Sequence, residues 1–591
     1  MNNHVGNRNV IFITADQLRA DCIVENGKYS KFVKTPNLDR LKKLGVSFEK
    51  HYTQTCPCGP ARASLHTSRY LFNHMVYDNG IPLPTRISET GWPSQIFQHT
   101  NKQVQPYLLG YVDLSIDLSD EQYKDKPEMI HWEGGYLKHL KRIDDMDFIG
   151  TKKWLNEHLD FHPYNEEHKM FETVKKSTNG HLWNGYTGQS TWLHTRKPRL
   201  NTTTDDNNTN LPPRPTLQKS FKSSVSYLFI NRTMEFINTE IAKKRNFALH
   251  LSFLKPHPPW VVPTPYHELY SKDSVRQFLK ENGYFKSHDE ILNNHPYIEK
   301  VNTTANPFAH RFGASGGAAH VNMEERVTDL CNYFALITEL DDNIGRLLDY
   351  LENQKLLQNT MIVFTCDHGE QLYDHNFIGK LGLFEDSFNI PCIVYAPSCE
   401  QNKIVDTKFT ESIDVAPTII EFMCGKDKIP RCYDGKSLFP FLQKDFNNNN
   451  NNIPWRDGAH FEYDFSFWGW SPKDTQAYMD FTGKMNNMKR SECMITCLRK
   501  EKWKLVYFAN SKLLPPILFD MINDPNETTN VAAENQNVLL EMISEILNWK
   551  ISYNGRSNDP LSNMKIISDG VVVQLNEEEE RSKRRRQRSK L

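Results

Sequence analysis

Long apolar runs are missing from this sequence. No stretch approaches the roughly 20 consecutive apolar residues that a membrane-spanning helix needs. The polar segment 1–9 leads directly into the apolar run 10–14, without the charged start, long apolar stretch and small-residue cleavage site of a secretory signal. We therefore expect a soluble protein with no membrane span and no export signal.

An excess of charge is missing too. The chain has 71 basic and 72 acidic residues, which gives a formal net charge of -1. No overall electrostatic field would draw such a protein to nucleic acid or to an anionic membrane. Any basic site must be local, and we expect no nucleic-acid partner.

Cysteines are few and scattered: eleven in 591 residues. Their spacings match neither a zinc site nor a disulfide framework. We expect most of them to be reduced thiols in the core.

What the sequence does contain is enough apolar material for a large core, with 38% hydrophobic and 12% aromatic residues. At this length we expect roughly two to four folding units. Short β-branched and aromatic runs alternate with helical patterns, which predicts an α/β fold with a mostly parallel central sheet flanked by helices. The predicted strands are 10–14, 247–253, 361–365 and 393–395, and the predicted helices include one opening at 35–41 and one over 323–356.

Composition changes divide the chain. We predict a catalytic domain over 8–425 and a smaller C-terminal α+β domain over 454–553, in which 503–508 forms a strand and 538–550 an amphipathic helix. The segment 195–215 is rich in Asn, Thr, Asp and Pro and predicts a disordered insertion, and the Asn run 447–452 lies where the first domain should end.

The remaining segment, 554–591, is a tail with an acidic run followed by a basic one, which predicts a solvated and disordered segment. It ends in Ser589-Lys590-Leu591, which at a free C-terminus is a peroxisomal import address. We expect a location in the cytosol or the peroxisome, with the import receptor as a partner if the address is used. A nuclear signal or a chance ending is the alternative.

Acidic residues follow two of the predicted strands. Asp16 comes directly after the first strand, and Asp367 and His368 follow the strand 361–365. Because the carboxyl ends of parallel strands meet at one edge of a sheet, these distant residues can converge. Two carboxylates and an imidazole suit one divalent cation such as calcium, manganese or magnesium, and Gln17 can add a neutral oxygen. Taken alone, an acidic residue after a strand is more often a helix cap.

A short motif lies between those strands. Cys58-Gly59-Pro60-Ala61-Arg62 has the pattern Cys-x-Pro-x-Arg and opens a predicted helix. Here the chain resembles the sulfatases of the alkaline phosphatase superfamily. The resemblance implies that a formylglycine-generating enzyme oxidises Cys58 to formylglycine, which supplies the nucleophile. Helix N–H groups and Arg62 would stabilise the negative charge that develops. Outside this context, Cys58 would be a buried structural thiol.

The resemblance covers nearly the whole chain except the Asn-rich insertions and the tail. Three features resemble the phosphonate monoester hydrolases, which also act on phosphodiesters and sulfate esters: Gln17 after Asp16, Ala61 within the motif, and the run 367–372. Carried over from that branch, the metal ligands are Asp16, Cys58, Asp367 and His368, with one divalent ion, Ca²⁺ or Mn²⁺. The substrate site is lined by Gln17, Arg62, Asn79, Tyr111, His257 and Lys380. The substrate would be a small anionic ester, and related hydrolases often assemble as homo-oligomers.

Two of these residues have possible roles in proton transfer. His257 could donate a proton to the leaving alcohol, and Lys380 could hold the substrate oxygens or act as an alternative acid. Otherwise they would be a loop histidine and a solvated lysine. One residue departs from the branch: Asp113 stands where the phosphonate hydrolases have a threonine, and a carboxylate there would repel a bound anion unless a cation compensates.

Three functions are therefore open. The first is a metal-dependent hydrolase of phosphonate monoesters, phosphodiesters or sulfate esters that uses formylglycine. The others are a sulfatase proper for a small sulfate ester and a non-catalytic descendant that binds a metal or an anion. In eukaryotes the formylglycine-generating enzyme works in the endoplasmic reticulum, so a cytosolic converter is needed, or Cys58 acts unmodified with slower turnover.

Overall fold

The structure, a computed structural model, describes most of the chain. The described residues are 8–79, 81–116, 137–143, 217–220, 224–258, 260, 262–284, 323–377, 379–380, 383–443, 454–464, 494–509, 515–554, 564–566 and 572–574. The predicted insertion at 195–215, the Asn run 447–452 and the charged tail from 577 to 591 lie outside them. The predicted domain boundaries stay predictions.

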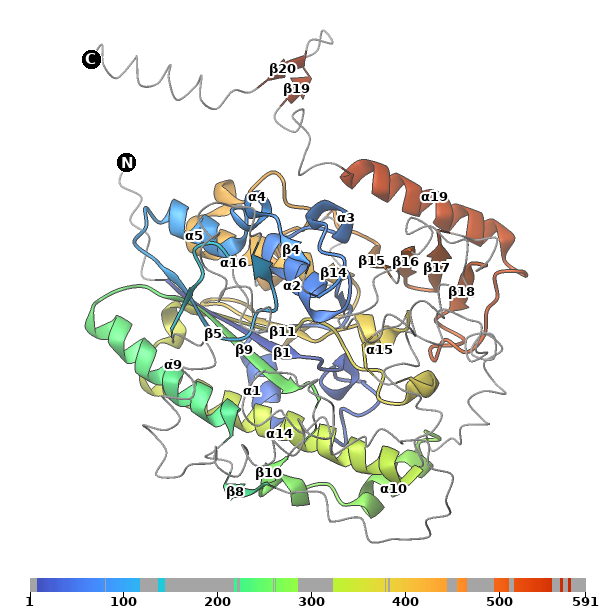
Figure 1. The fold of residues 1–591 in the computed structure, drawn as a ribbon, viewed down its shortest axis with the longest axis horizontal. Helices are drawn as coiled ribbons and strands as arrows, with labels where there is room; N and C mark the ends of the chain where they lie inside the picture. The colour runs from blue at the N-terminus through green and yellow to red at the C-terminus, as the bar shows by residue number, and fades with distance from the viewer. Residues whose placement is uncertain are drawn as a thin grey trace, which may run out of the picture.

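An eight-stranded, mostly parallel sheet forms the centre of the molecule (Figure 1). Its strand order is β13-β2-β12-β11-β1-β9-β5-β7. The neighbours β11, β1, β9, β5 and β7 are parallel, whereas β12 runs antiparallel to both β11 and β2. The bounds are β1 Asn9–Asp16, β2 Val46–Phe48, β5 Pro106–Gly110, β7 Lys141–Arg142, β9 Ala248–Pro256, β11 Thr360–Cys366, β12 Cys392–Tyr395 and β13 Lys403–Val405.

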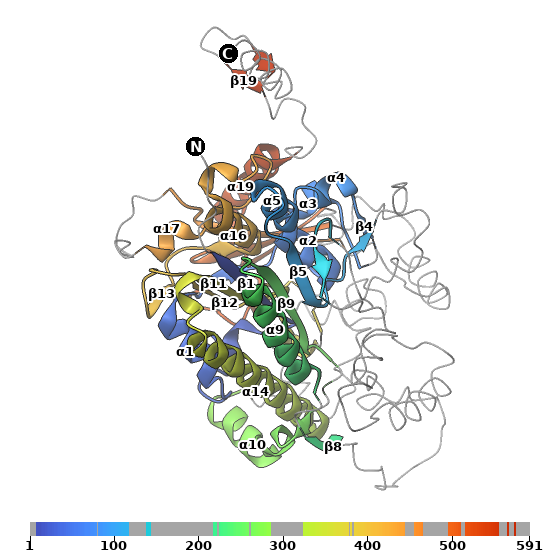
Figure 2. The ribbon, with the colours of Figure 1, turned by 90° about the vertical axis from the view of Figure 1, so that its left-hand side faces the viewer.

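Helices cover both faces of this sheet (Figures 1 and 2). One layer holds α1 (Pro36–Leu44), α9 (Val225–Ala242), α10 (Lys272–Glu281) and the long α14 (Met323–Asn353). The other holds α2 (Cys58–Thr67), α5 (Trp92–His99), α16 (Val415–Cys424) and α17 (Phe439–Leu442). The shorter helices are α3 Leu71–His74, α4 Thr85–Ser88 and α15 Glu385–Phe388, with single 3-10 turns at Ala20–Cys22, Tyr266–Glu268, Leu357–Asn359, Asp374–Asn376, Ser412–Asp414 and Lys426–Lys428.

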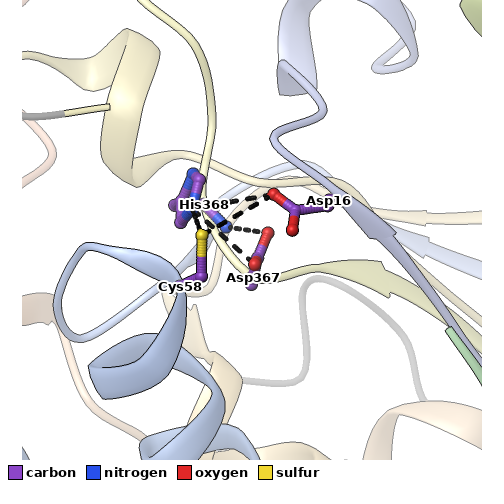
Figure 3. A group of neighbouring side chains, drawn as sticks. All are labelled: Asp16, Cys58, Asp367 and His368. Carbon is purple, nitrogen blue, oxygen red and sulfur yellow. Dashed lines mark hydrogen bonds and ion pairs between the residues drawn. The ribbon is translucent and has the colours of Figure 1, made fainter. Parts of the chain in front are cut away.

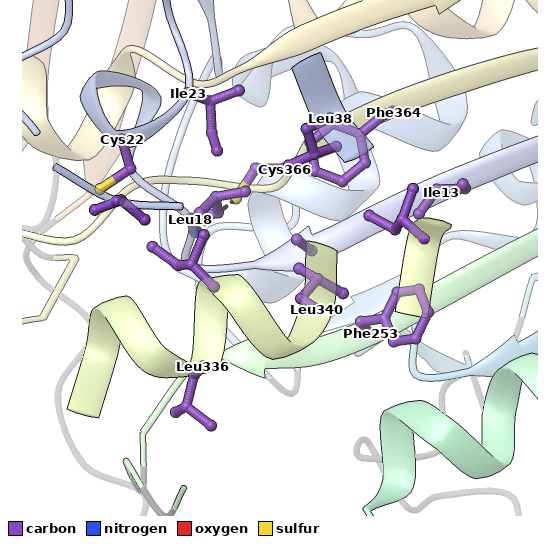
Figure 4. Packing of buried hydrophobic residues seen from close by; sticks show 14 of the residues in the cluster. Ile13, Leu18, Cys22, Ile23, Leu38, Phe253, Leu336, Leu340, Phe364 and Cys366 are labelled. Carbon is purple, nitrogen blue, oxygen red and sulfur yellow. Dashed lines mark hydrogen bonds between the residues drawn. The ribbon is translucent and has the colours of Figure 1, made fainter. Parts of the chain in front are cut away.

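The alternation of side chains along β1 explains why two core layers form. Ile11 and Ile13 pack against the α14 layer, shown in part in Figure 4, whereas Val10 and Phe12 pack against the α16 layer. All eight residues of β1 are buried, as expected for a central parallel strand covered on both faces.

A second, four-stranded antiparallel sheet follows in the C-terminal part, in the order β15-β16-β17-β18. Helix α19 (Gln536–Tyr553) packs on one face through Leu539, Met542 and Ile546, and Phe388 and Phe461 pack on the other face. The strands are β15 Gly458–Asp464, β16 Met494–Lys500, β17 Trp503–Phe508 and β18 Ile517–Asp520. Two-residue to four-residue ladders complete the described strands: β3 His51–Tyr52 with β14 Thr410–Glu411, β4 Pro82–Leu83 with β6 Ser115–Ile116, β8 Leu217–Ser220 with β10 Pro263–Thr264, and β19 Met564–Ile566 with β20 Val572–Gln574.

The predicted fold class is confirmed: a mostly parallel sheet between helices, with a smaller antiparallel α+β unit after it. The strands predicted at 10–14, 247–253, 361–365 and 393–395 correspond to β1, β9, β11 and β12, and the strand predicted at 503–508 is β17. None of the described helices combines the length and the apolar character that a bilayer crossing requires.

Candidate active site

Three neighbouring strands end at one edge of the central sheet. Strand β1 lies between β11 and β9 and is parallel to both, so their carboxyl ends emerge together. Asp16 is the last residue of β1, Asp367 and His368 follow β11, and His257 follows β9. The sheet topology alone therefore gathers four polar side chains that are up to 352 positions apart in the sequence.

Cys58 completes this group from the side of α2, of which it is the first residue. One ligand atom from each of Asp16, Cys58, Asp367 and His368 lies within 4.8 Å of every other (Figure 3). The Cys58 Sγ is 3.2 Å from His368 Nε2 and 3.9 Å from Asp16 Oδ1, and His368 Nε2 is 3.6 Å from Asp367 Oδ2. All four side chains are buried.

The orientation of these groups suits a bound cation. His368 Nδ1 lies 3.0 Å from the carbonyl oxygen of Gly369, to which it donates as the Nδ1–H tautomer, so the Nε2 lone pair faces the other ligand atoms. Asp367 Oδ1 accepts hydrogen bonds from the backbone N–H groups of Gln17 (3.1 Å) and His368 (2.9 Å). Two carboxylates, an oriented imidazole and a sulfur-bearing side chain are a donor set that fits one divalent metal ion.

Arg62 is fully buried, and its guanidinium is hydrogen-bonded to the carboxylates of both Asp16 and Asp367. Nε donates to Asp367 Oδ2 at 3.0 Å, and one terminal nitrogen donates to Asp16 Oδ2 at 3.2 Å. The other terminal nitrogen donates to the carbonyl oxygen of Tyr111 and to Ser252 Oγ, both at 2.9 Å. These bonds use four of the five N–H groups of Arg62. These bonds hold the carboxylates of Asp16 and Asp367 in place.

Lys380 and His257 form a second pair beside Cys58. The half-buried Lys380 ammonium donates to Cys58 Sγ at 2.8 Å and to Gln17 Oε1 at 3.0 Å, and it lies 3.0 Å from His257 Nε2. His257 Nδ1 lies 2.5 Å from the carbonyl oxygen of Pro258. A carbonyl only accepts, so Nδ1 carries the proton and Nε2 accepts from Lys380.

Gln17 connects Lys380 to Glu370, a residue to which the sequence analysis gave no role. Gln17 Nε2 donates to Glu370 Oε2. Glu370 is buried, and its other oxygen accepts from the backbone N–H groups of Leu372 (2.9 Å) and Gly379 (2.5 Å). Glu370 thereby fixes the loop that carries both Lys380 and the metal ligands. It stood inside the predicted motif at 367–372, but nothing in the sequence gave it a role.

Asn79 and Tyr111 both contact residues in the first turns of α2. Asn79 Oδ1 accepts from the backbone N–H of Gly59 at 2.7 Å, so Asn79 caps one of the free N–H groups at the start of the helix. The ring of Tyr111 stacks on the guanidinium of Arg62, 4.5 Å from its centroid. Ser252, a further partner of Arg62, is an interior residue of β9 and carried no signal in the sequence.

Burial and the crowding of charges shift the pKa values of this group. Burial and the nearby Asp367 raise the pKa of Asp16, whereas the pKa of Asp367 is held low against its burial by His368, Arg62 and Lys380. Burial lowers the pKa of His368 to about 4, so its imidazole is neutral near pH 7. Burial and Asp16 raise the pKa of the Cys58 thiol.

Burial and the neighbouring Lys380 ammonium lower the pKa of His257. Burial disfavours the charged form of Lys380, but Cys58 and Asp16 more than offset it and raise the pKa of the ammonium. Near neutral pH the pair therefore consists of a charged lysine and a neutral histidine. In this arrangement Lys380, not His257, holds the proton that could leave.

The sequence of this chain is similar to those of known proteins over most of its length. The sequence model of the family described as Sulfatase matches residues 8–426, and the one described as N-sulphoglucosamine sulphohydrolase, C-terminal, matches residues 373–551. The multifunctional alkaline phosphatase superfamily protein PehA of Trinickia caryophylli is 31% identical over 562 residues, which is 93% of this chain and 96% of that protein. An arylsulfatase of Clostridium perfringens is 24% identical and covers 77% of this chain and 82% of its own length.

Among solved structures, the phosphonate monoester hydrolase of Silicibacter pomeroyi superposes with a TM-score of 0.70 at 26% identity, covering 96% of this chain and 99% of that one. The phosphonate monoester hydrolase of Agrobacterium radiobacter gives a TM-score of 0.68 at 25% identity, with the same coverage. Both likenesses extend over the central sheet and the C-terminal unit alike.

Proposed function

This chain belongs to the sulfatase family, and from that premise we propose that it is a metal-dependent hydrolase of phosphonate monoesters, phosphodiesters or sulfate esters whose nucleophile is a formylglycine made from Cys58. The family and its relatives already make it a sulfuric or phosphoric ester hydrolase. The observation that carries the finer proposal is the position of Cys58 Sγ, within reach of both His368 and Lys380 at the start of α2.

Asp16, Asp367, His368 and the converted side chain of residue 58 would hold one divalent cation, Ca²⁺ or Mn²⁺. Their ligand atoms already lie within 4.8 Å of one another, and the imidazole is neutral and turned toward the carboxylates. When bound, the cation supplies Lewis-acid stabilisation of charge on the nucleophile and the ester oxygens.

The chain's own residues prepare the site for an anionic ester. Arg62 keeps the carboxylates of Asp16 and Asp367 in place, because it donates a hydrogen bond to each of them and another to Ser252. Helix α2 presents its N-terminus at residue 58, where the helix dipole favours a negatively charged group. The neutral amide of Gln17, in place of a further carboxylate, adds no negative charge beside that group.

Lys380 is the proton donor that this geometry favours. Its ammonium lies 2.8 Å from Cys58 Sγ, and the nearby Asp16 and Asp367 favour its charged form. A leaving alcohol beside that side chain could take a proton from Nζ. His257 accepts from Lys380 with its Nε2 and so fixes the direction of the ammonium, which makes it a positioning residue in this scheme.

Mass spectrometry of the peptide that contains Cys58 tests the proposal directly. Conversion to formylglycine lowers the mass of the residue and gives an aldehyde that reacts with hydrazides, and an unmodified thiol does neither. The protein must come from a host that contains a formylglycine-generating enzyme, because that enzyme is the partner the proposal requires.

Kinetics of a Cys58→Ala variant provide the second test. We expect loss of turnover on aryl phosphonates, aryl phosphodiesters and aryl sulfates alike, and rates equal to those of the unaltered protein would disprove the nucleophile. Cys424→Ala is the matched control, since Cys424 is a half-buried thiol at the end of α16, and it should keep its activity. Esters with the same leaving group, compared side by side, would separate a sulfatase proper from a phosphonate hydrolase.

A further inference from the structure

Asp113 is a buried acidic residue that the proposed mechanism does not use. It lies on the loop after β5, and the end of β5 pairs with β9 through Gly110 and Ser252. The loop therefore reaches the same sheet edge as the active site. The side chain of Asp113 is only 1% exposed, and its backbone adopts a left-handed conformation with φ of 49°.

The backbone of Asp113 packs against the start of α2. A Cβ atom added to Gly59 would lie 3.0 Å from the carbonyl oxygen of Asp113 and 3.1 Å from Asn79 Oδ1. A larger residue at position 59 would push this loop away, so glycine there permits the close approach. The approach brings Asp113 next to the residue that follows Cys58.

The carboxyl group of Asp113 lacks the hydrogen bonds that its neighbours have. Neither oxygen has a partner of normal geometry among the described residues, and the Tyr111 hydroxyl on the same loop lies close but outside that geometry. Asp16 and Asp367 accept from Arg62, and Glu370 accepts from three donors. Asp113 is the exception within the site.

Within the described ranges, no cation forms an ion pair with Asp113. Arg62 spends its donors on Asp16, Asp367, Ser252 and the Tyr111 carbonyl, and Lys380 spends its three on Cys58, Gln17 and His257. Burial raises the pKa of Asp113 well above its ordinary value. The charged and titratable groups that act on it come from every side of the site: Arg62 and Cys58 on α2, Asp16 on β1, Lys380 after β11, and Tyr111 on its own loop.

A buried polar group without a partner is costly unless a ligand completes it. The anionic group of a sulfate ester, a phosphodiester or a phosphonate monoester has hydrogen-bond acceptors but no donors, so a carboxylate would repel it and a carboxylic acid would bond to it. Resting on the proposed function, we propose that Asp113 is a substrate-binding residue, which donates a hydrogen bond from its carboxylic acid to an oxygen of the bound ester group.

Two variants of similar shape test this role. Asp113→Asn keeps a hydrogen-bond donor without a charge, and Asp113→Leu removes it. We expect kcat/KM of Asp113→Asn to stay within about threefold of the unaltered protein and that of Asp113→Leu to fall about 10-fold to 100-fold, the range for one lost hydrogen bond to a charged group. The inhibition constant of inorganic sulfate should rise by a similar factor in Asp113→Leu alone, with unchanged metal content and with thermal stability that is equal or higher.

Three results would overturn the inference. Equal losses in both variants would mean that the carboxylate itself is needed, an unaffected Asp113→Leu would mean that nothing binds there, and loss of metal from Asp113→Leu would make Asp113 part of the metal site. If the unaltered protein hydrolyses none of the aryl esters, the proposed function has failed instead, and sulfate binding still decides the role of Asp113.

Discussion

Arg19 and Arg62 are buried arginines that each gather carboxylates, and the clusters around them differ in how completely their charges are paired. In one cluster a single terminal nitrogen of Arg19 contacts Asp21 at 2.6 Å, Asp374 at 2.9 Å and Asp386 at 2.7 Å, and Lys28 contacts Asp374 at 2.6 Å. Every carboxylate there touches a cation. The cluster is complete as it stands.

The cluster around Arg62 also has two cations and three carboxyl groups, but they are arranged differently. Arg62 pairs with Asp16 and Asp367, whereas Lys380 contacts Cys58, Gln17 and His257, and Asp113 pairs with neither cation. In the cluster around Arg62, residues of the same types thus place several hydrogen-bond acceptor atoms next to one another. We interpret the first cluster as structural, whereas the arrangement of the second fits the proposed cation and anionic substrate.

The two clusters are connected. Arg19 also donates at 3.0 Å to the carbonyl oxygens of Glu370 and Gln371, which follow the proposed metal ligands Asp367 and His368. The paired cluster therefore anchors the loop that carries half of the unpaired one. Stability and activity should separate when each cluster is altered in turn.

Asp16→Asn should produce the largest effect, and on activity alone. Loss of a charged ligand should cost several kcal/mol of transition-state stabilisation, which corresponds to about a thousandfold or more in kcat/KM, together with loss of metal. The metal-free variant should be as stable as the metal-free parent or slightly more stable, since burial and Asp367 disfavour the charge of Asp16. Kinetics, metal analysis and urea unfolding measure the three quantities, with Asp39→Asn as the control, since the Asp39 side chain on α1 is half exposed. A large loss of stability would contradict the proposed contrast.

Arg19→Met should reverse that pattern. The substitution leaves three carboxylates and two carbonyl oxygens without their buried cation, which typically costs about 3–5 kcal/mol of unfolding free energy. Arg40→Met is the matched control, because Arg40 is 31% exposed and pairs with Asp349 and Glu352 at the surface, where such pairs contribute less than about 1 kcal/mol. Urea unfolding of both variants measures the difference, and equal losses would show that Arg19 has no special structural role.

The sequence predicted the parts of the site that follow from sheet topology. Asp16, Asp367 and His368 could be placed together because each follows a strand, and parallel neighbours end at one edge. The helix beginning at Cys58 came from its motif and the family resemblance. These predictions needed no knowledge of side-chain contacts.

What could not be predicted depends on how loops lie against one another. The hydrogen bonds of Arg62 to both carboxylates, the bond from the Gln17 amide to Glu370, and the bond from Lys380 to His257 all arise from contacts between segments far apart in the chain. Local propensity carries no information about such contacts.

Helix α2 also carries a histidine whose role we interpret as structural. His66, at the far end of this helix from Cys58, is buried, accepts from Trp92 Nε1 at 2.8 Å, and has its pKa lowered by burial to about 3. As pH falls below about 6.5, the unfolded chain protonates this histidine first, so its contribution to stability is present above that pH and lost below it.

A His66→Phe variant isolates the contribution of His66 to the pH dependence of stability. The variant should be less stable at pH 7.5 by about 1–3 kcal/mol, because the Trp92 N–H loses its acceptor. Below pH 6.5 the gap to the parent should narrow by about 1.4 kcal/mol per pH unit, since only the parent loses the histidine term and all other groups titrate in both proteins. Urea unfolding at pH 7.5, 6.5 and 5.5 measures the gap, and a constant gap would contradict the lowered pKa of His66.

Asn79→Ala should have the smallest effect. It decides whether Asn79 has a structural role or binds substrate. Asn79 was predicted to bind substrate, but its Oδ1 accepts from the Gly59 N–H and caps α2. If capping is its main role, the alanine variant loses about 1 kcal/mol of unfolding free energy, and KM changes by less than about threefold. An increase of tenfold or more in KM with unchanged stability would instead place Asn79 among the substrate-binding residues. Asn79→Asp separates the two further, because a carboxylate still accepts from the Gly59 N–H and favours the positive end of the helix dipole, yet repels an anionic ester.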